Sequence, residues 1–95
     1  MTSAGFEAAL RVARFCKALG HPARATIVRL LLGQRRSLTC GEIVAQLPLA
    51  QSTVSQHLRV LVRAGLVTAQ EERPRVLYAA ERGTLDELRR GLAAL

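Results

Sequence analysis

Aromatic residues and cysteines are scarce in this chain. Two Phe and one Tyr occur among 95 residues and Trp is absent, so the core must consist mainly of Leu, Val, Ile and Ala. Two cysteines are too few for a disulfide framework, and we expect reduced thiols in a cytoplasmic protein. No apolar run approaches the roughly 20 residues that cross a bilayer, and no cationic segment leads into an apolar one as in a secretory signal. We therefore expect no membrane partner.

Acidic residues are also few. Seven Asp and Glu oppose thirteen Arg and one Lys, which gives a formal charge of +7 and a pI near 11.3. Such a balance favours a polyanionic partner, although an Arg-rich proteome would produce it without one. The chain also lacks a convincing Ser/His/Asp arrangement, a glycine-rich phosphate loop and paired carboxylates in a plausible pocket. The sequence therefore predicts a binding protein and not an enzyme.

The stretch from Gln51 to Gly65, QSTVSQHLRVLVRAG, predicts a helix with two different faces. Val54, Leu58 and Leu61 recur at helical spacing and require a core. The remaining polar residues in the first half are short and uncharged, whereas a solvated helix face is usually rich in Lys and Glu. Such a face, followed by Arg, suits the base edges and phosphates of a DNA major groove. Gly65 is expected to end the helix as its left-handed C′ residue.

DNA contacts are expected from this helix and from a basic loop after it. Arg59 and Arg63 are placed to reach phosphates, and Arg73 and Arg75 to reach phosphates or a narrow minor groove. The alternatives are a solvated loop, and a structural His57 packed against the hairpin. The predicted DNA-contacting residues are Gln51, Ser52, Thr53, Ser55, Gln56, His57, Arg59, Arg63, Arg73 and Arg75.

Three helices are predicted before this stretch. The first runs from Phe6 to Leu19 and the second from Pro22 to Leu32, with His21 as a cap or packed residue. Thr39 begins a capping-box spacing and predicts a third helix from Cys40 to Leu47. The third helix and the stretch after it are joined by a tight turn, which makes a helix-turn-helix.

The pattern changes after this helix-turn-helix. Leu66–Thr68 and Val76–Tyr78 are strand-like, and Ala69–Arg75 between them is a polar loop, so a hairpin or wing is predicted. Thr84 and Glu87 repeat the capping-box spacing and are expected to open a last helix. The predicted fold is mainly α with a small β-hairpin, a winged helix-turn-helix in which residues 1–95 form a single domain.

Two further apolar surfaces predict a dimer. The first helix has a second apolar stripe away from its core-facing stripe, and the last helix has a leucine seam with spacings of three, four and three residues. The alternative is a terminal helix with a few exposed alanines. A dimer would add the stability that a short chain lacks. The predicted interface residues are Phe6, Leu10, Ala13, Leu85, Leu88, Leu92 and Leu95.

With this order of elements, two segments carry a family resemblance. FCKALGHPARATIVRLLL and LTCGEIVAQLPLAQSTVSQHLRVLVRAGLV resemble the opening helices and the helix-turn-helix signature of the ArsR/SmtB family of bacterial winged-helix repressors. The resemblance covers about Phe15 to Tyr78. The resemblance implies a homodimer that binds an inverted-repeat operator, represses transcription and uses its first and last helices as the interface. Many members release DNA when a metal, metalloid or oxidant reaches cysteine or histidine sites.

The chain departs from the family at those sensing sites. Arsenic, cadmium and lead sensors carry Cys-Val-Cys at the start of the third helix, whereas the matching stretch Leu38–Gly41 holds only Cys40. Zinc, nickel and cobalt sensors need Asp and His on the last helix, where Asp86 is the only candidate and no histidine follows His57. The second class of site is therefore not expected.

Cys16 and Cys40 are the remaining effector candidates. Thiolates bind soft metals and As(III), so one hypothesis is As(III) held by both cysteines, within or between subunits. A helix N-terminus lowers a thiol pKa, so a second hypothesis is an oxidation switch through Cys40. Inert thiols that pack as small hydrophobes, with no effector, are the third alternative. A winged-helix module that binds an acidic protein is the competing function from another class.

Overall fold

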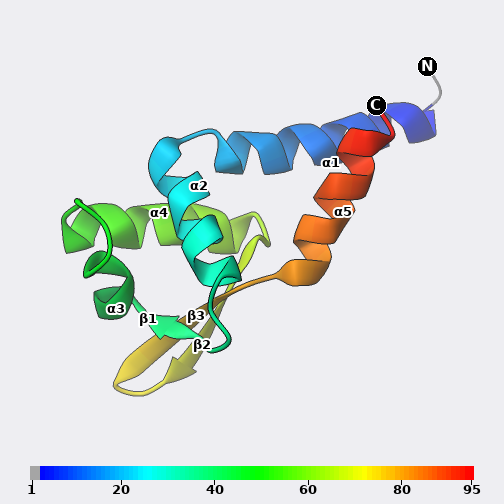
Figure 1. The fold of residues 1–95 in the computed structure, drawn as a ribbon. Coiled ribbons are helices and arrows are strands. Elements are labelled where there is room, and N and C mark those ends of the chain that lie inside the picture. The colour runs from blue at the N-terminus through cyan, green and yellow to red at the C-terminus, as the bar shows by residue number, and fades with distance from the viewer. Residues whose placement is uncertain (1–2) are drawn as a thin grey trace.

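The computed structural model describes residues 3–95, which form five helices and a small antiparallel sheet at one edge of the molecule (Figure 1). Helices α3 and α4 form the helix-turn-helix, and strands β2 and β3 form the hairpin that follows it. The predicted mainly α fold with a β-hairpin wing is confirmed. The elements are α1 Ser3–Leu19, α2 Pro22–Leu32, β1 Leu38–Thr39, α3 Cys40–Val44, α4 Gln51–Arg63, β2 Val67–Glu72, β3 Arg75–Ala80 and α5 Arg82–Ala93.

Local signals set the starts of α2 and α3. The His21 side chain accepts a hydrogen bond from the Ala23 backbone N–H (3.1 Å), so His21 is the N-cap of α2, and Pro22 follows at the first helical position. Thr39 accepts from the Glu42 backbone N–H (3.2 Å), while the Glu42 carboxylate accepts from the Thr39 N–H (2.9 Å). Both predicted caps are confirmed, and each satisfies backbone donors that a helix start leaves free.

The end of α4 is a Schellman motif. The Gly65 N–H donates to the Val62 carbonyl and the Leu66 N–H donates to the Leu61 carbonyl, both at 3.0 Å. Gly65 has φ +82, a left-handed conformation that glycine adopts without the strain of a Cβ atom. The chain turns here from α4, the second helix of the helix-turn-helix and hence its recognition helix, into β2. The fully buried Leu66 anchors that turn in the core.

The sheet connects the wing to the helix-turn-helix. Strand order is β1-β3-β2, with Leu38 opposite Tyr78 and with β2 and β3 paired from Val67–Ala80 to Glu72–Arg75. Because β1 runs directly into α3, the start of the helix-turn-helix is fixed to the central strand of the wing.

The core is aliphatic, as the shortage of aromatic residues predicts. It lies between α2, the inner face of α4, α3 and the sheet, and Phe15 only packs against its margin. In residues 3–95 no helix combines the length and the apolar character needed to cross a membrane. The largest fully buried side chains are Ile27, Leu38, Ile43, Val54, Leu58, Leu61, Leu66 and Val67.

Several predicted boundaries were wrong. Helix α1 begins at Ser3 rather than Phe6. Helix α3 ends at Val44 rather than Leu47, because the backbone N–H groups of residues 46 and 47 donate to carbonyls three residues back instead of four. Strand β1 was not predicted, and the supposed loop 69–75 is mostly strand, since the hairpin turns only at residues 73–74. Helix α5 is capped by Glu81, which accepts from the Gly83 N–H (3.2 Å), so Thr84 lies inside the helix.

Helices α1 and α5 extend away from the helix-turn-helix and bring the start of α1 and the end of α5 to the same side (Figure 1). An Arg11–Glu87 ion pair joins the two helices. Leu85 and Leu88 are each only 6% exposed, because they pack within this chain. The predicted leucine seam is therefore not one continuous free surface, and Leu88 cannot test an interface without also disturbing the fold.

Other residues of the predicted interface remain accessible at this end of the molecule. Phe6 is 56% exposed, Leu92 46% and Leu95 83%, while Ala13 is exposed and Leu10 half-buried. These three large side chains are the exposed large hydrophobic residues of the described chain. The surface that a second copy could cover is therefore smaller than predicted and is centred on the two helix ends.

Candidate nucleic-acid interface

Helix α4 has the two faces that its sequence predicts. Val54, Leu58 and Leu61 are fully buried beneath it. Gln51, Ser52, Gln56, Arg59 and Arg63 are exposed on the other sides, and Thr53 and Ser55 are half-buried. No acidic residue lies on this helix. The outer surface of α4 therefore offers neutral hydrogen-bonding groups in its first turns and positive charge in its last turns.

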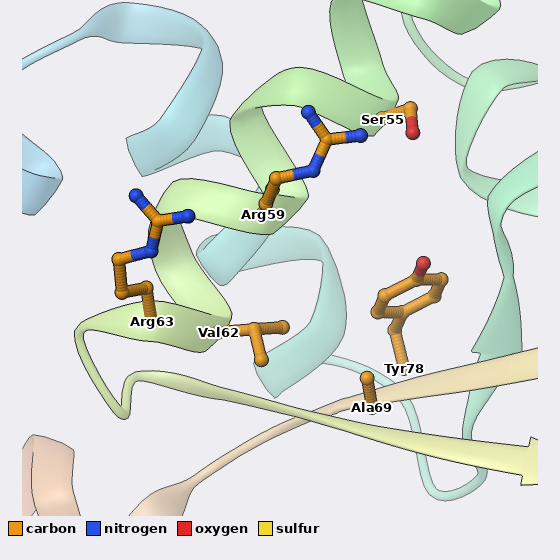
Figure 2. A pocket seen from close by; sticks show the side chains of 6 residues that line it. All are labelled: Ser55, Arg59, Val62, Arg63, Ala69 and Tyr78. Atoms are coloured by element: carbon orange, nitrogen blue, oxygen red, sulfur yellow. The ribbon is translucent and has the colours of Figure 1, made fainter.

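A groove separates the recognition helix from the wing (Figure 2). It has a volume of about 400 Å³ and is lined by Ser55, Arg59, Val62 and Arg63 of α4 and by Ala69 and Tyr78 of the hairpin. Figure 2 shows the Ser55 and Tyr78 hydroxyl groups facing each other across it, with the two arginines along the helix. Hydroxyl and guanidinium groups in one groove suit phosphate and sugar contacts.

Tyr78 was missed as a site residue. Its partial burial raises the pKa of the phenol, and the nearby Cys40 adds to that effect while Arg59 opposes it. The hydroxyl is therefore neutral at ordinary pH and can both donate and accept a hydrogen bond. The strand-like run alone could not identify it, because the residues that face α4 depend on the register with β1 and β2.

His57 faces α2 instead of the outer surface. Its ring lies 4.5 Å from the His21 ring, centroid to centroid, and its Nδ1 is 3.5 Å from an Arg24 nitrogen. Burial, followed by the charges of His21 and Arg24, lowers the pKa of His57 and favours the neutral imidazole. These contacts favour a structural role for His57 over the predicted DNA contact. His57 packs against the start of α2, however, and not against the wing as the structural alternative expected.

The wing tip carries its charges in water. Arg73, Pro74 and Arg75 are exposed, and the Arg73 Nε lies 3.6 Å from a Glu71 carboxylate oxygen, a contact between two highly exposed groups. An exposed pair of this kind is weak and can be exchanged for a phosphate. Arg75 makes no ion pair within residues 3–95, so it is the freer of the two arginines.

One neighbouring arginine is held by the fold. Arg36 pairs with Glu42 at 2.6 Å, and this hydrogen bond, together with the backbone N–H of Thr39, lowers the pKa of Glu42 to about 2. Glu42 thus supports the α3 cap and the loop before β1 together. Arg36 is less available for phosphate contact than Arg35, which is exposed and has no ion pair in the described part of the chain.

Comparisons with known proteins agree with this geometry. A family model described as a helix-turn-helix domain matches residues 19–70. The HTH-type transcriptional regulator Rv0081 of Mycobacterium tuberculosis is 39% identical over 77 residues, which are 80% of this chain and 66% of that protein. The chain belongs to the ArsR family of helix-turn-helix transcriptional regulators.

Solved structures of ArsR-family regulators share the fold. An ArsR-like transcriptional regulator from Rhodococcus sp. RHA1 superposes with a TM-score of 0.77 at 24% identity, over 90% of this chain and 78% of that one. The transcriptional repressor BigR from Xylella fastidiosa gives 0.74 at 29% identity, over 95% and 92%. The family consists of DNA-binding regulators and not of enzymes, which agrees with the prediction from the sequence.

The two cysteines of this ArsR-family chain lie on different elements. Cys16 is exposed on α1, across the top of Figure 1, whereas Cys40 is half-buried at the start of α3, at the lower left. Burial raises the pKa of the Cys40 thiol, which is the opposite of the predicted lowering. The region covered by residues 3–95 contains no group of three or more His, Cys, Asp or Glu that could hold a metal ion. A shared As(III) site stays a prediction.

Proposed function

We propose that this chain is a transcriptional repressor that binds an inverted-repeat operator as a homodimer in the bacterial cytoplasm. The observation that supports it most is the outer face of α4, which offers neutral donors and acceptors beside arginines and carries no acid. That combination suits a major groove, where amide and hydroxyl groups read base edges and arginines bind phosphates.

Homodimer formation is supported by the exposed apolar end of the molecule. Phe6, Leu92 and Leu95 are costly to leave in water, and they lie on α1, on α5 and just after α5, respectively. A two-fold axis near this end would give a pair of recognition helices on the same side. Binding to successive major grooves would then require a separation of about 34 Å between them.

The direct test selects operator fragments from a genomic library and measures their affinity for the purified protein over a range of salt. The expected result is a palindromic site that binds far more tightly than random duplex, with strong salt dependence in both cases. In an in vitro transcription assay with this site placed over a promoter, addition of the protein should reduce the yield of transcript. Equal affinity for all duplexes would refute a specific operator, and binding only to acidic proteins would favour the protein-interaction module.

An effector response is a separate part of the proposal. As(III) or another thiophilic compound is the proposed inducer, with oxidation of the same thiols as the second candidate. Cys16 is the accessible site of first attack, because its side chain is exposed, while Cys40 is half-buried and close enough to Tyr78 to raise the pKa of its phenol. Two thiols on separate helices within one chain support at most a weak As(III) site unless they approach each other across the dimer.

A further inference from the structure

A second groove runs along the other side of the recognition helix, between α4, α1 and the start of α2. Its volume is about 400 Å³, equal to that of the groove on the wing side. Arg14 and Lys17 of α1, Arg24 of α2 and Arg63 of α4 line it, and its floor includes Val60 and Ala64. Three helices, α1, α2 and α4, therefore place four cationic side chains around one shallow apolar surface.

The charge of this groove is not neutralised by the protein. The sequence contains no acidic residue between Ala8 and Gly41 or between Ile43 and Gln70, which covers every segment that lines the groove. The ion pairs of residues 3–95 involve other arginines, on α1, the wing, α5 and the loop before β1. Arg24 donates to the Ala18 carbonyl (2.6 Å), so that its position is fixed, and it is in none of the ion pairs formed within residues 3–95.

We propose that this groove binds the DNA phosphodiester backbone on the edge of the major groove opposite the wing. An α-helix with its side chains is about 10–12 Å wide and fills a major groove about 12 Å wide, so sugar-phosphate strands run along both of its sides. Arg63 lines both grooves and lies between them. The apolar floor gives the deoxyribose a surface to pack on, while the cations contact phosphate oxygens.

The sequence of α1 fits this arrangement. Phe6, Leu10 and Ala13 form its outer apolar stripe, and Lys17 continues the same stripe one turn later with a charge. The first half of α1 thus carries the surface proposed for dimerisation, and the second half carries the proposed DNA contact. The proposal rests on DNA binding by α4, but it adds residues of α1 and α2 that the helix-turn-helix signature does not include.

The first test uses the fact that Lys17 is the only lysine of the chain. Acetic anhydride will modify Lys17 and the N-terminal amine, and mass spectrometry of peptides will report each rate separately. Saturation with a random-sequence duplex in low salt should slow acetylation of Lys17 several-fold and leave the N-terminal amine unchanged. Equal Lys17 rates with and without bound duplex would overturn the proposal. Equal protection by inorganic phosphate would also overturn it and indicate a small-anion site.

The second test measures the salt dependence of duplex binding. Arg14→Gln/Lys17→Gln should lower the slope of log K against log salt by about 0.9 for each lost phosphate contact. Arg89→Gln/Arg90→Gln on α5 removes the same charge from a helix that packs on α1, and it should leave the slope nearly unchanged. All four side chains are exposed, so thermal unfolding of both variants should match wild type.

The two proposals fail in different ways. If wild-type protein shows no salt-dependent binding to duplex, DNA binding itself is refuted. If wild type binds but the α1 variant keeps the wild-type slope, DNA binding stands and only the second groove is refuted.

Discussion

Alanine at Gly65 should separate the role of backbone conformation from that of packing. An L-residue in the left-handed region costs about 1–2 kcal/mol, and Gly65 has φ +82. No atom lies within 4 Å of the position that a Cβ would take, so no clash adds to this cost. Alanine also lowers the conformational entropy of the unfolded chain, which stabilises the folded state by about 0.4–1 kcal/mol. The expected net effect of Gly65→Ala is therefore a loss of about 1 kcal/mol.

The chain offers a matched control at the end of α2. Gly33 also follows a helix, but its φ is −77 and its ψ is −7, which alanine adopts freely. An added Cβ would approach the Leu30 carbonyl oxygen at 3.5 Å, an ordinary contact. Gly33→Ala should therefore be neutral or stabilise the protein by up to about 1 kcal/mol, because only the unfolded-chain effect remains.

The assay is thermal and denaturant unfolding of both variants by circular dichroism, at one fixed protein concentration because the proposed dimer would make stability depend on concentration. For a domain of this size, a loss of 1 kcal/mol corresponds to a fall in Tm of about 4–8 °C. Gly65→Ala should show that fall and Gly33→Ala should not. If the two variants unfold at the same midpoint, the backbone argument is refuted.

Four further predictions concern binding, assembly and induction. Gln56→Ala should weaken operator binding by about 1–3 kcal/mol and spare random duplex, and equal losses on both would show that it reads no bases. Arg75→Ala should lower the salt slope of log K by about one per subunit if the wing contacts phosphate, so an unchanged slope places the tip in solvent. Leu92→Glu should give monomers in sedimentation without loss of fold, because this side chain is 46% exposed, whereas a dimeric variant would contradict the interface. Cys16→Ser and Cys40→Ser should each raise the As(III) concentration needed to release operator DNA, and wild-type behaviour of both would exclude the thiols as sensors.

The parts of the fold that the sequence predicts are those determined by near neighbours. The caps at His21 and Thr39 and the turn at Gly65 each depend on hydrogen bonds that span two to five residues. The buried face of α4 follows from a helical repeat within one element. These features are visible in the residue order because the groups that interact are close in the chain.

The features that were missed depend on contacts between distant segments. Strand β1 is two residues long and exists because Leu38 pairs with Tyr78, forty positions later. His57 lies against His21 only because α4 packs on α2. Leu88 is buried only because α5 packs on other helices of the same chain. A repeat of leucines shows that a helix has an apolar side, but it cannot show which partner covers that side.

The pairing of β1 with β3 also defines an exchangeable unit. The segment from Leu38 to Ala80 contains the helix-turn-helix and the whole wing, and Leu38 at its start pairs with Tyr78, two residues before its end. A segment with adjacent ends can be replaced by the corresponding segment of a relative without changing the distance between the flanking helices. The contact of α2 with α4 and β3 is the main surface that such an exchange must match. Chimaeras built at these two boundaries would combine the helix-turn-helix and wing of one regulator with the flanking helices of another.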